Sequence, residues 1–286
     1  MNGVVCILVL YNPKVELIKK VLESLLSQVD SIIAVDNSNV DNRLLVTSFG
    51  DKVIYIPLHG NVGIATAQNI AIEKAKEYNF KYVFFLDQDS IVEQNMISRL
   101  VRCYENLRDS SIKVGAVGPR PINRENGKEY RGKVKRGTQF TDGITEVTEL
   151  ISSASLIPIE NFNVIGGMDD GLFIDGVDHE WCWRGRRDGY RFFIDEHTHL
   201  SHKLGEGDRY FIFRKVAIPT PFRTYYQFRN YFKLLKRSYV PIYWKCSNGF
   251  KYLIKIFYFP LFVAPRRAYL KNIFRGIKDG VSSLMK

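Results

Sequence analysis

The run KYVFFLDQDS (Lys81–Ser90) ends an apolar segment in two carboxylates, Asp87 and Asp89. Its first six residues are typical of a buried strand. Because side chains alternate along an extended chain, Asp87 and Asp89 are expected to point the same way, with Gln88 opposed. Carboxylate oxygens are hard ligands that suit Mg²⁺ or Mn²⁺ carrying a diphosphate. Asp is also common in the turns that follow strands, so a structural interpretation stays open.

Other polar residues follow further predicted strands. In a doubly wound sheet the carboxyl ends of the strands meet along one edge, where ligands bind. Asp36 could accept a hydrogen bond from the N3–H of a uracil or thymine ring, and Gly63 would let the backbone approach a phosphate or ribose closely. Each residue alone has a simpler interpretation as a turn former or helix cap. The set comprises Tyr11, Asn12, Asp36, Asn61, Gly63 and Asn69.

The elements that must position these residues alternate between strand and helix patterns over the first 120 residues. This β-α-β alternation predicts an α/β fold with a mostly parallel, Rossmann-like central sheet covered by helices on both faces. The expected strands are 4–11, 31–35, 52–57, 81–86 and 114–117, and the expected helices are 13–28, 66–78 and 93–107.

The second half of the chain is less regular. Its polar, glycine-punctuated stretch 121–149 predicts hairpins or a mobile flap. Beyond it we expect strands over 151–157 and 190–194, a short helix over 158–165, and a helix over 222–239. The two tryptophans Trp181 and Trp183 could stack on sugar rings or pack in the core.

Composition restricts the class of protein. A chain of 286 residues, 45% of them hydrophobic, forms one large domain or one domain with an appendage, and is too apolar for disorder. The cysteines Cys6, Cys103, Cys182 and Cys246 are widely spaced, which predicts free thiols in a reducing compartment. The opening apolar run is short and lacks a basic leader, so we expect no signal peptide.

Positive charge is concentrated at the carboxyl end. Residues 203–286 hold 18 Lys and Arg against three acids, and 20 of the aromatic residues. Such a tail suits an anionic partner, either membrane headgroups or nucleic acid. No helix-turn-helix, zinc-finger or RNA-recognition pattern is apparent, which disfavours nucleic acid. The stretch 252–263, interrupted by Lys255 and Pro260, is too short to span a membrane, and predicts an interfacial amphipathic element or, alternatively, core-packing helices.

These motifs, in this order, resemble family 2 glycosyltransferases of the GT-A fold. The matching segments are VLYN, AVDNSN, NVGIATAQN, LDQDS, ISSASLIP, DDGLFIDGVDHEWCWR and HLSHKLG, within residues 3–205. The segments LDQDS, FIDGVDHEW and YYQFRN are similar to those of bacterial rhamnosyltransferases. The resemblance implies a catalytic domain over 1–205, a helical C-terminal region over 206–286, and inverting, metal-dependent transfer of L-rhamnose from dTDP-L-rhamnose to a hydroxyl of a cell-surface polysaccharide precursor. Another nucleotide sugar is the alternative donor.

The resemblance also implies roles for the residues of the edge. Asp36 corresponds to the residue that recognises the base, and Asn61, Gly63 and Asn69 fall in the segment that contacts the nucleotide. Tyr11, Asn12 and Gln88 are expected beside them in the nucleotide-sugar site. Asp87 is expected near the ribose or the diphosphate–metal unit, Asp89 on the Mg²⁺ or Mn²⁺ ion, and His202 where relatives place a further metal ligand.

The catalytic base is expected at Asp178. Alignment on Trp183-Arg184 matches Asp178 to the second acid of the Glu-Asp pair of the family, although Val177 replaces the first. One carboxylate must take the acceptor proton, while the metal absorbs the charge of the leaving diphosphate. Asp175 and Glu180 remain alternative bases, and Asp178 could instead cap a helix.

The resemblance places the enzyme in the cytoplasm, at the inner face of a bacterial membrane, with a lipid-linked saccharide as acceptor. Arg229 and Asn230 of the YYQFRN segment could reach phosphates of the acceptor or pack against the catalytic domain, and we favour packing.

Overall fold

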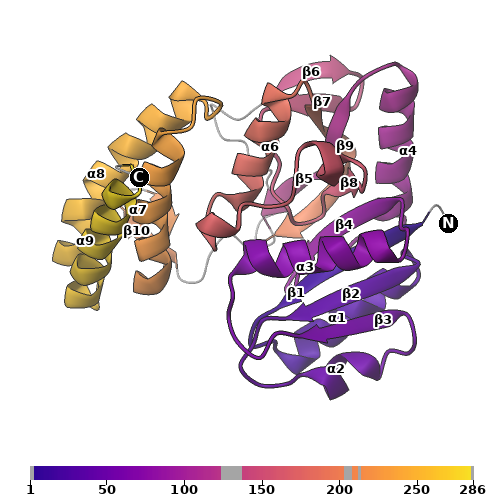
Figure 1. Cartoon of the computed structure of the whole chain (residues 1–286), viewed down its shortest axis with the longest axis horizontal. Helices are drawn as coiled ribbons and strands as arrows, with labels where there is room; N and C mark the ends of the chain where they lie inside the picture. The colour runs from indigo at the N-terminus through magenta and orange to yellow at the C-terminus, as the bar shows by residue number, and fades with distance from the viewer. Residues whose placement is uncertain (1–2, 124–136, 203–207, 212–213, 285–286) are drawn as a thin grey trace.

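The protein is built around one nine-stranded sheet, seen in a computed structural model that describes residues 3–123, 137–202, 208–211 and 214–284. The strands of the amino-terminal half are parallel, in the order β3-β2-β1-β4 (Figure 1). The predicted β-α-β alternation is therefore confirmed. The elements are β1 (Val4–Leu10), α1 (Val15–Leu26), β2 (Ser31–Asp36), α2 (Arg43–Thr47), β3 (Val53–Pro57), α3 (Ile64–Glu77), β4 (Tyr82–Asp87) and α4 (Met96–Asp109).

The other half of the sheet is mixed. β8 (Leu156–Pro158) is antiparallel to β4 and to β5 (Val114–Asn123), while β9 (Arg191–His202) runs parallel to β5. The hairpin of β6 (Thr138–Thr141) and β7 (Ile144–Val147) completes the sheet and confirms the hairpin expected within 121–149.

The strand expected over 151–157 is wrong for its first residues. The amide of Ser155 donates to the Ser152 carbonyl at 2.9 Å, and Ala154 has a φ of 62°, so this segment turns before β8 begins. Strands β5 and β9 are both longer than the sequence pattern predicts, because they continue to pair with each other beyond the apolar stretch.

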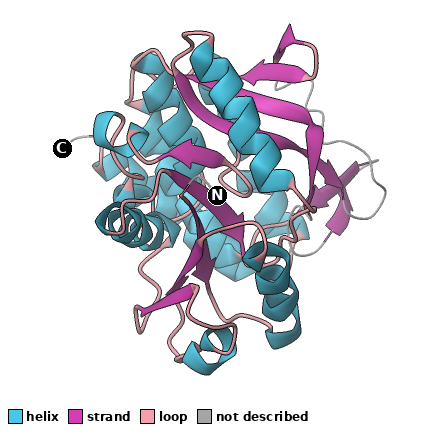
Figure 2. Cartoon of the chain, turned by 90° about the vertical axis from the view of Figure 1, so that its right-hand side faces the viewer, coloured by secondary structure: helices cyan, strands magenta, loops and turns pink. Residues whose placement is uncertain are grey.

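Two hydrophobic cores lie on opposite faces of the sheet. Along β1, Cys6 and Leu8 face the core that includes α1 and α4, and Val5 and Ile7 face the core that includes α3 and α6 (Val177–Arg187). This follows from the two-residue period of a strand, and explains why β1 is apolar throughout. Helices therefore flank both faces of the sheet (Figure 2).

The C-terminal region forms three helices beside the sheet domain (Figure 1). These are α7 (Pro221–Leu235), α8 (Ile242–Phe262) and α9 (Arg266–Ser282). α7 matches the predicted helix, whereas α9 lies in the region expected to be helical but was not predicted as a separate helix. α8 includes Pro260 in its last turn, where the missing N–H removes the one hydrogen bond that would run back to the Ile256 carbonyl. Trp244 of α8 packs on Trp183, with ring centroids 5.1 Å apart. No helix in the described ranges is long and apolar enough to cross a membrane.

The remaining elements are short: α5 (Asn161–Val164), the 3₁₀ helix η1 (Asp170–Leu172), β10 (Asp208–Phe211) and β11 (Arg214–Ala217). The four cysteines are free thiols, as expected, and Cys6, Cys103 and Cys182 are buried.

Candidate functional site

The polar strand ends meet at one edge of the sheet. In the parallel register, Leu10 lies beside Asp36, Val9 beside Asp87, and Asp36 beside Pro57. The residues that follow these strands therefore gather at the same edge, where ligands bind α/β sheets.

The two acids of the LDQDS segment are separated by a turn. β4 ends at Asp87, and the amide of Ser90 donates to the Asp87 carbonyl at 3.0 Å. The prediction that Asp87 and Asp89 point the same way assumed an extended chain from one to the other. This assumption is wrong, because the chain turns after Asp87. Asp87 is half-buried and its amide donates to Ser153 Oγ at 3.1 Å, while Asp89 is exposed.

Gln88 joins two strand ends. Its Oε1 accepts from the Tyr11 amide at 2.8 Å, and its Nε2 donates to the Tyr11 carbonyl at 3.0 Å. This pair of hydrogen bonds fixes the backbone after β1 against the turn after β4. The phenol ring of Tyr11 stays exposed at 47%, so it is available to a ligand.

Asp36 is a buried carboxylate that organises the loop after β2. It accepts hydrogen bonds from Tyr55 Oη at 2.5 Å, from Asn42 Nδ2 at 2.8 Å, and from the amides of Ser38 and Asn42 at 3.1 Å. Burial opposes its charge, but the hydrogen bonds from Tyr55, Ser38 and Asn42 outweigh burial and lower the pKa of Asp36. Asp36 is therefore ionised at neutral pH and acts as an acceptor.

Sequence reasoning missed Asn37 and Ser38 as positioning residues. Ser38 Oγ accepts from the Asn12 amide at 2.8 Å. The Asn37 side chain accepts from the Val62 amide at 2.8 Å and donates to Asn61 Oδ1 at 3.1 Å. The AVDNSN segment contains these residues, but a single sequence gives no sign that their side chains bridge three loops.

Gly63 and Asn69 tie α3 to a loop 100 residues later in the chain. Gly63 has a φ of 89°, and a Cβ there would lie 2.6 Å from the Phe173 ring. The Phe173 carbonyl accepts from the Ile64 amide at 2.8 Å, so it satisfies the first turn of α3. Asn69 exchanges hydrogen bonds with the Met168 backbone at 2.7 and 2.9 Å. These contacts require glycine and asparagine here, and the nucleotide roles of both residues stay predictions.

Asp178 lies in the first turn of α6. The helix is preceded by Gly176, and Asp178 Oδ1 accepts from the His179 amide at 2.9 Å, so the carboxylate engages one donor of the first turn without being the N-cap. Asp178 also lines a cavity of about 10 Å³ with Ser152 and Trp181. Among the residues whose side chains the structure describes, none forms an ion pair with Asp178.

The two alternative bases are engaged in ion pairs. Glu180 is 1% exposed, and its carboxylate contacts Arg184 at 2.9 Å, Arg237 at 3.0 Å and the Tyr239 hydroxyl at 2.6 Å. Asp175 accepts from Arg223 Nε at 2.9 and 3.0 Å. Both acids therefore hold α7 and the segment after it to the sheet domain.

Other aromatic and polar candidates are structural. Trp181 and Trp183 are each 1% exposed, so they pack in the core and do not present a surface for sugar rings. Asn230 Nδ2 donates to the carbonyls of Leu172, Ile174 and Asp175. Arg229 Nη2 donates to Gly171 and Leu172 carbonyls, which confirms the packing expected for YYQFRN.

The predicted metal ligands are only partly described. His202 is the last residue of β9, and its side chain lies outside the described residues. No group of three or more His, Cys, Asp or Glu that could hold a metal ion occurs among the residues the structure describes. The carboxylates of Asp87 and Asp89 nevertheless give the edge the oxygen ligands that Mg²⁺ and Mn²⁺ prefer.

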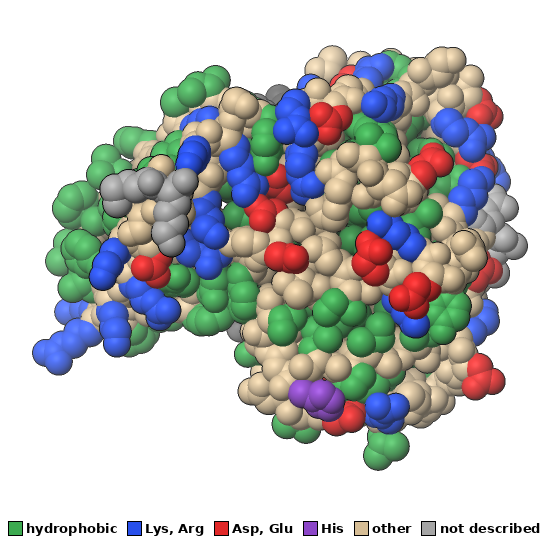
Figure 3. Space-filling model, in the orientation of Figure 1, with side chains coloured by type: hydrophobic (Ala, Val, Ile, Leu, Met, Phe, Trp, Pro, Cys, Tyr) green, Lys and Arg blue, Asp and Glu red, His purple; other side chains and the backbone are tan. Residues whose placement is uncertain are grey.

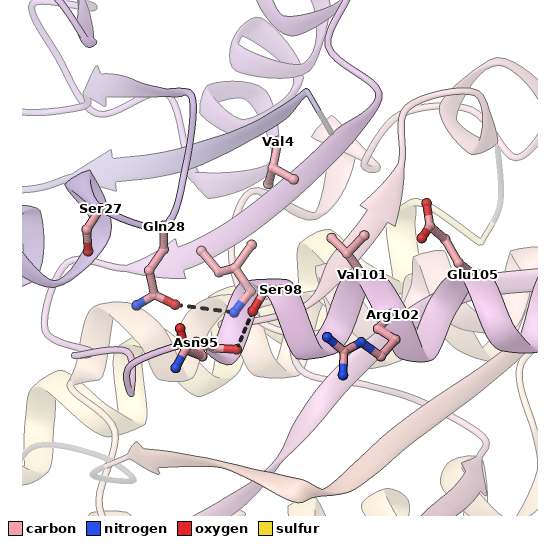
Figure 4. A pocket seen from close by; sticks show the side chains of 9 residues that line it. Val4, Ser27, Gln28, Asn95, Ser98, Val101, Arg102 and Glu105 are labelled. Atoms are coloured by element: carbon pink, nitrogen blue, oxygen red, sulfur yellow. Dashed lines mark hydrogen bonds between the residues drawn. The ribbon is translucent and has the colours of Figure 1, made fainter. Parts of the chain in front are cut away.

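A larger cavity lies at the opposite edge of the sheet. It has a volume of about 410 Å³ and is lined by Val4, Gln28, Asn95 and Arg102, among others (Figure 4). Val4 begins β1, whereas the acids follow strand ends, so a seven-residue strand of roughly 20 Å separates the two regions. This cavity therefore does not belong to the candidate site.

The sheet and its flanking helices form a fold of the GT-A class. The structure of GalNAc-T7 with UDP, GalNAc and Mn²⁺ superposes with a TM-score of 0.61 at 15% identity, over 98% of this chain and 54% of that one. S. aureus TarS 1–349 in complex with UDP-GlcNAc gives a TM-score of 0.58 at 15% identity, over 96% of this chain and 81% of that one. At this identity the likeness concerns the fold, and it confirms the expected GT-A fold.

The chain belongs to glycosyl transferase family 2, whose family model matches residues 5–159. It is similar to the dTDP-rhamnosyl transferase RfbF of Shigella flexneri, with 31% identity over 251 residues, 84% of this chain and 82% of that protein. It is also similar to the low-salt glycan biosynthesis hexosyltransferase Agl10 of Haloferax volcanii, with 26% identity over 63% of this chain and 61% of that protein. The protein is therefore an enzyme, a glycosyltransferase.

Proposed function

We propose that this enzyme transfers L-rhamnose from dTDP-L-rhamnose, with inversion, to a hydroxyl of a saccharide acceptor that is a lipid-linked precursor of a cell-surface polysaccharide. The observation that supports this choice of donor is the 31% identity with a dTDP-rhamnosyl transferase across 84% of the chain. The proposal assigns base recognition to Asp36, whose ionised carboxylate can accept the N3–H of thymine or of uracil.

In this proposal, different residues at the edge of the sheet bind different parts of the donor. Asp36 recognises the base, and the loops held by Asn12, Asn61 and Gly63 surround the nucleoside. Asp87 and Asp89, with His202, would hold Mg²⁺ or Mn²⁺, which when bound neutralises charge on the leaving diphosphate. The structure of GalNAc-T7 with UDP and Mn²⁺, which shares this fold, supports a divalent ion here.

Asp178 is the base in this proposal, because its neighbours Asp175 and Glu180 are already neutralised by guanidinium groups. The Glu180 carboxylate contacts Arg184 and Arg237, and the Asp175 carboxylate contacts Arg223, so the oxygens of both acids are already engaged. Asp178 accepts a hydrogen bond from one backbone amide and keeps the rest of its carboxylate for an acceptor hydroxyl.

The donor is tested by incubating the enzyme with single nucleotide sugars and measuring release of the nucleoside diphosphate by chromatography. dTDP-L-rhamnose is expected to be consumed fastest, with UDP-GlcNAc and UDP-galactose at least about tenfold slower, because lost base and sugar contacts each cost roughly 1.4 kcal/mol or more. Faster consumption of a UDP-sugar would reject the donor assignment and leave the glycosyltransferase class intact.

The C-terminal helices supply a surface for an anionic membrane. Four large apolar side chains recur along one face of α8, and Figure 3 shows hydrophobic groups with Lys and Arg beside them at this end of the molecule. Phe250, Leu253, Phe257 and Leu261 are 54–66% exposed. Exposed basic residues lie on two of these helices, one on α8 and four on α9: Lys251, Arg266, Arg267, Lys271 and Lys278. Apolar groups that enter the headgroup region beside cations fit an interfacial helix, which would bring the catalytic domain to a lipid-linked acceptor.

Phe257→Glu is expected to reduce co-sedimentation with phosphatidylglycerol vesicles several-fold, because it places a charge on the apolar face of α8. Leu44→Glu is the matched control, since Leu44 is 87% exposed on α2, away from the C-terminal helices. Binding should also weaken with salt, since each basic residue near the surface contributes about 1 kcal/mol that is screened over roughly 8 Å. Equal binding of the two variants, or no binding of the unmodified enzyme at low salt, would reject the membrane surface.

A further inference from the structure

Three polar side chains of the C-terminal helices line up beside the segment that leads into α6. Arg223 lies in the first turn of α7, and Gln227 lies one turn further on the same face. Lys255 of α8 donates from Nζ to Gln227 Oε1 at 2.8 Å. We call Arg223, Gln227 and Lys255 the cationic cluster. It joins two of the three C-terminal helices at the place where they face the candidate active site.

The cationic cluster lies within electrostatic reach of the active-site acids. Burial opposes the charge of Arg223, but its hydrogen bonds to Asp175 and the charges of Asp175, Asp178 and Asp87 raise its pKa. Arg223 therefore lies within electrostatic reach of the predicted base, Asp178, and of Asp87 at the end of β4.

Lys255 adds a second cation to the same place. Burial lowers its pKa to about 8; the charge of Asp175 opposes this shift, and Lys251 and Arg223 add to it. Two cations therefore lie near Asp175 in a partly desolvated position. A pair of cations in such a position can bind an additional anion when a contact with Asp175 is given up.

Arg223 keeps hydrogen-bonding capacity for a ligand. Its side chain is 49% exposed, and Nε and Nη2 contact Asp175. A guanidinium has five N–H donors, and no described residue accepts from Nη1. Asp175 has a φ of 68°, unusual for a residue with a Cβ, and its carbonyl is held by Asn230 Nδ2 at 3.0 Å. The fold thus holds the Asp175 carboxylate against Arg223 as an internal anion.

We propose that the cationic cluster is a subsite for a phosphate or diphosphate group, and that Asp175 occupies Arg223 until this ligand arrives. A planar guanidinium matches the geometry of phosphate oxygens, and Lys255 supplies a second charge. The inference rests on the proposed function for its ligand. The group belongs either to the nucleoside diphosphate of the donor or to the phosphates that link an acceptor to its lipid.

The test compares two variants that break the same ion pair from opposite sides, Arg223→Gln and Asp175→Asn. Each full-length variant is titrated by calorimetry with dTDP, and in a second arm with geranyl diphosphate, a short prenyl diphosphate. Arg223→Gln is expected to weaken binding of one probe about tenfold or more, because a charge-assisted hydrogen bond is lost. Asp175→Asn frees Arg223 and is expected to leave affinity for that probe unchanged or higher. Which probe responds identifies the source of the phosphate.

Two controls separate binding from stability. Arg108→Gln is the matched substitution, since Arg108 pairs with Asp109 at 2.8 Å and its side chain is 46% exposed, away from the cluster. Thermal unfolding shows whether Arg223→Gln and Asp175→Asn destabilise the fold equally, and Arg223→Lys is expected to recover part of the affinity. Loss of affinity in both variants to the same extent would mean that the pair is only structural, and would overturn the inference. Unchanged affinity of Arg223→Gln for both probes, or no binding of either probe by the unmodified enzyme, would overturn it too. An unmodified enzyme that binds geranyl diphosphate but not dTDP would contradict the proposed donor alone.

Discussion

Replacing Asp178 by Asn is expected to lower the rate of sugar transfer by about 10²- to 10⁴-fold, with affinity for dTDP nearly unchanged. Asn has the shape of Asp and cannot take the proton of the acceptor hydroxyl. Its effect on stability should be small, because Asp178 makes one local hydrogen bond, to the His179 amide, and its favourable charge at the start of α6 is worth only about 0.3–1 kcal/mol. Initial rates of transfer, calorimetry with dTDP and thermal unfolding measure the three quantities.

The neighbouring acids serve as controls for this assignment. Glu180→Gln should lower the melting temperature, because losing one partner of a buried ion pair costs about 3–5 kcal/mol, and Arg184 and Arg237 would lose theirs. Asp175→Asn should keep most of the transfer rate. If Asp178→Asn retained the normal rate and Asp175→Asn lost it, the base would be Asp175.

The amino-terminal half of the fold could be predicted because its signals are local. Each strand from β1 to β4 is a short apolar run, the predicted helices α1 and α3 alternate with these strands, and the parallel arrangement follows from this alternation. The five-residue helix α2 was not predicted. The same reasoning brought Asp36 and Asp87 to one edge of the sheet, since the carboxyl ends of parallel strands meet there. The register of β1 with β2 and β4 agrees with this prediction.

The contacts that complete the site could not be predicted, because they join residues far apart in the chain. Phe173 meets Gly63, Arg223 meets Asp175, and Gln88 meets the backbone of Tyr11 across 77 residues. A strand pattern also does not reveal where a strand stops. The turn that begins at Asp87 and the turn before β8 both interrupt alternation that the residue types alone would allow to continue.

Removal of divalent metal is expected to abolish most of the binding of dTDP, and Asp89→Asn is expected to do the same at limiting metal. In the proposed function Asp87 and Asp89 hold the ion beside the diphosphate, and without a cation these two carboxylates would repel the diphosphate. Even outer partners of metal ligands cost about 10–100-fold in metal affinity or activity when removed, so a direct ligand should cost at least as much. Calorimetry with dTDP, in Mn²⁺ and in chelator, measures the effect without requiring an acceptor.

Asp51→Asn is the matched control for Asp89→Asn. Asp51 is an exposed carboxylate just before β3, at the opposite edge of the sheet, so its loss changes the net charge equally without touching the site. If both variants bound dTDP alike, the effect would be a general one of charge. Equal affinity of the unmodified enzyme in Mn²⁺ and in chelator would remove the metal role from Asp87 and Asp89. The charge of the leaving diphosphate would then have to be met by protein cations, and Arg223 with Lys255 are cations placed to do so within the described part of the chain.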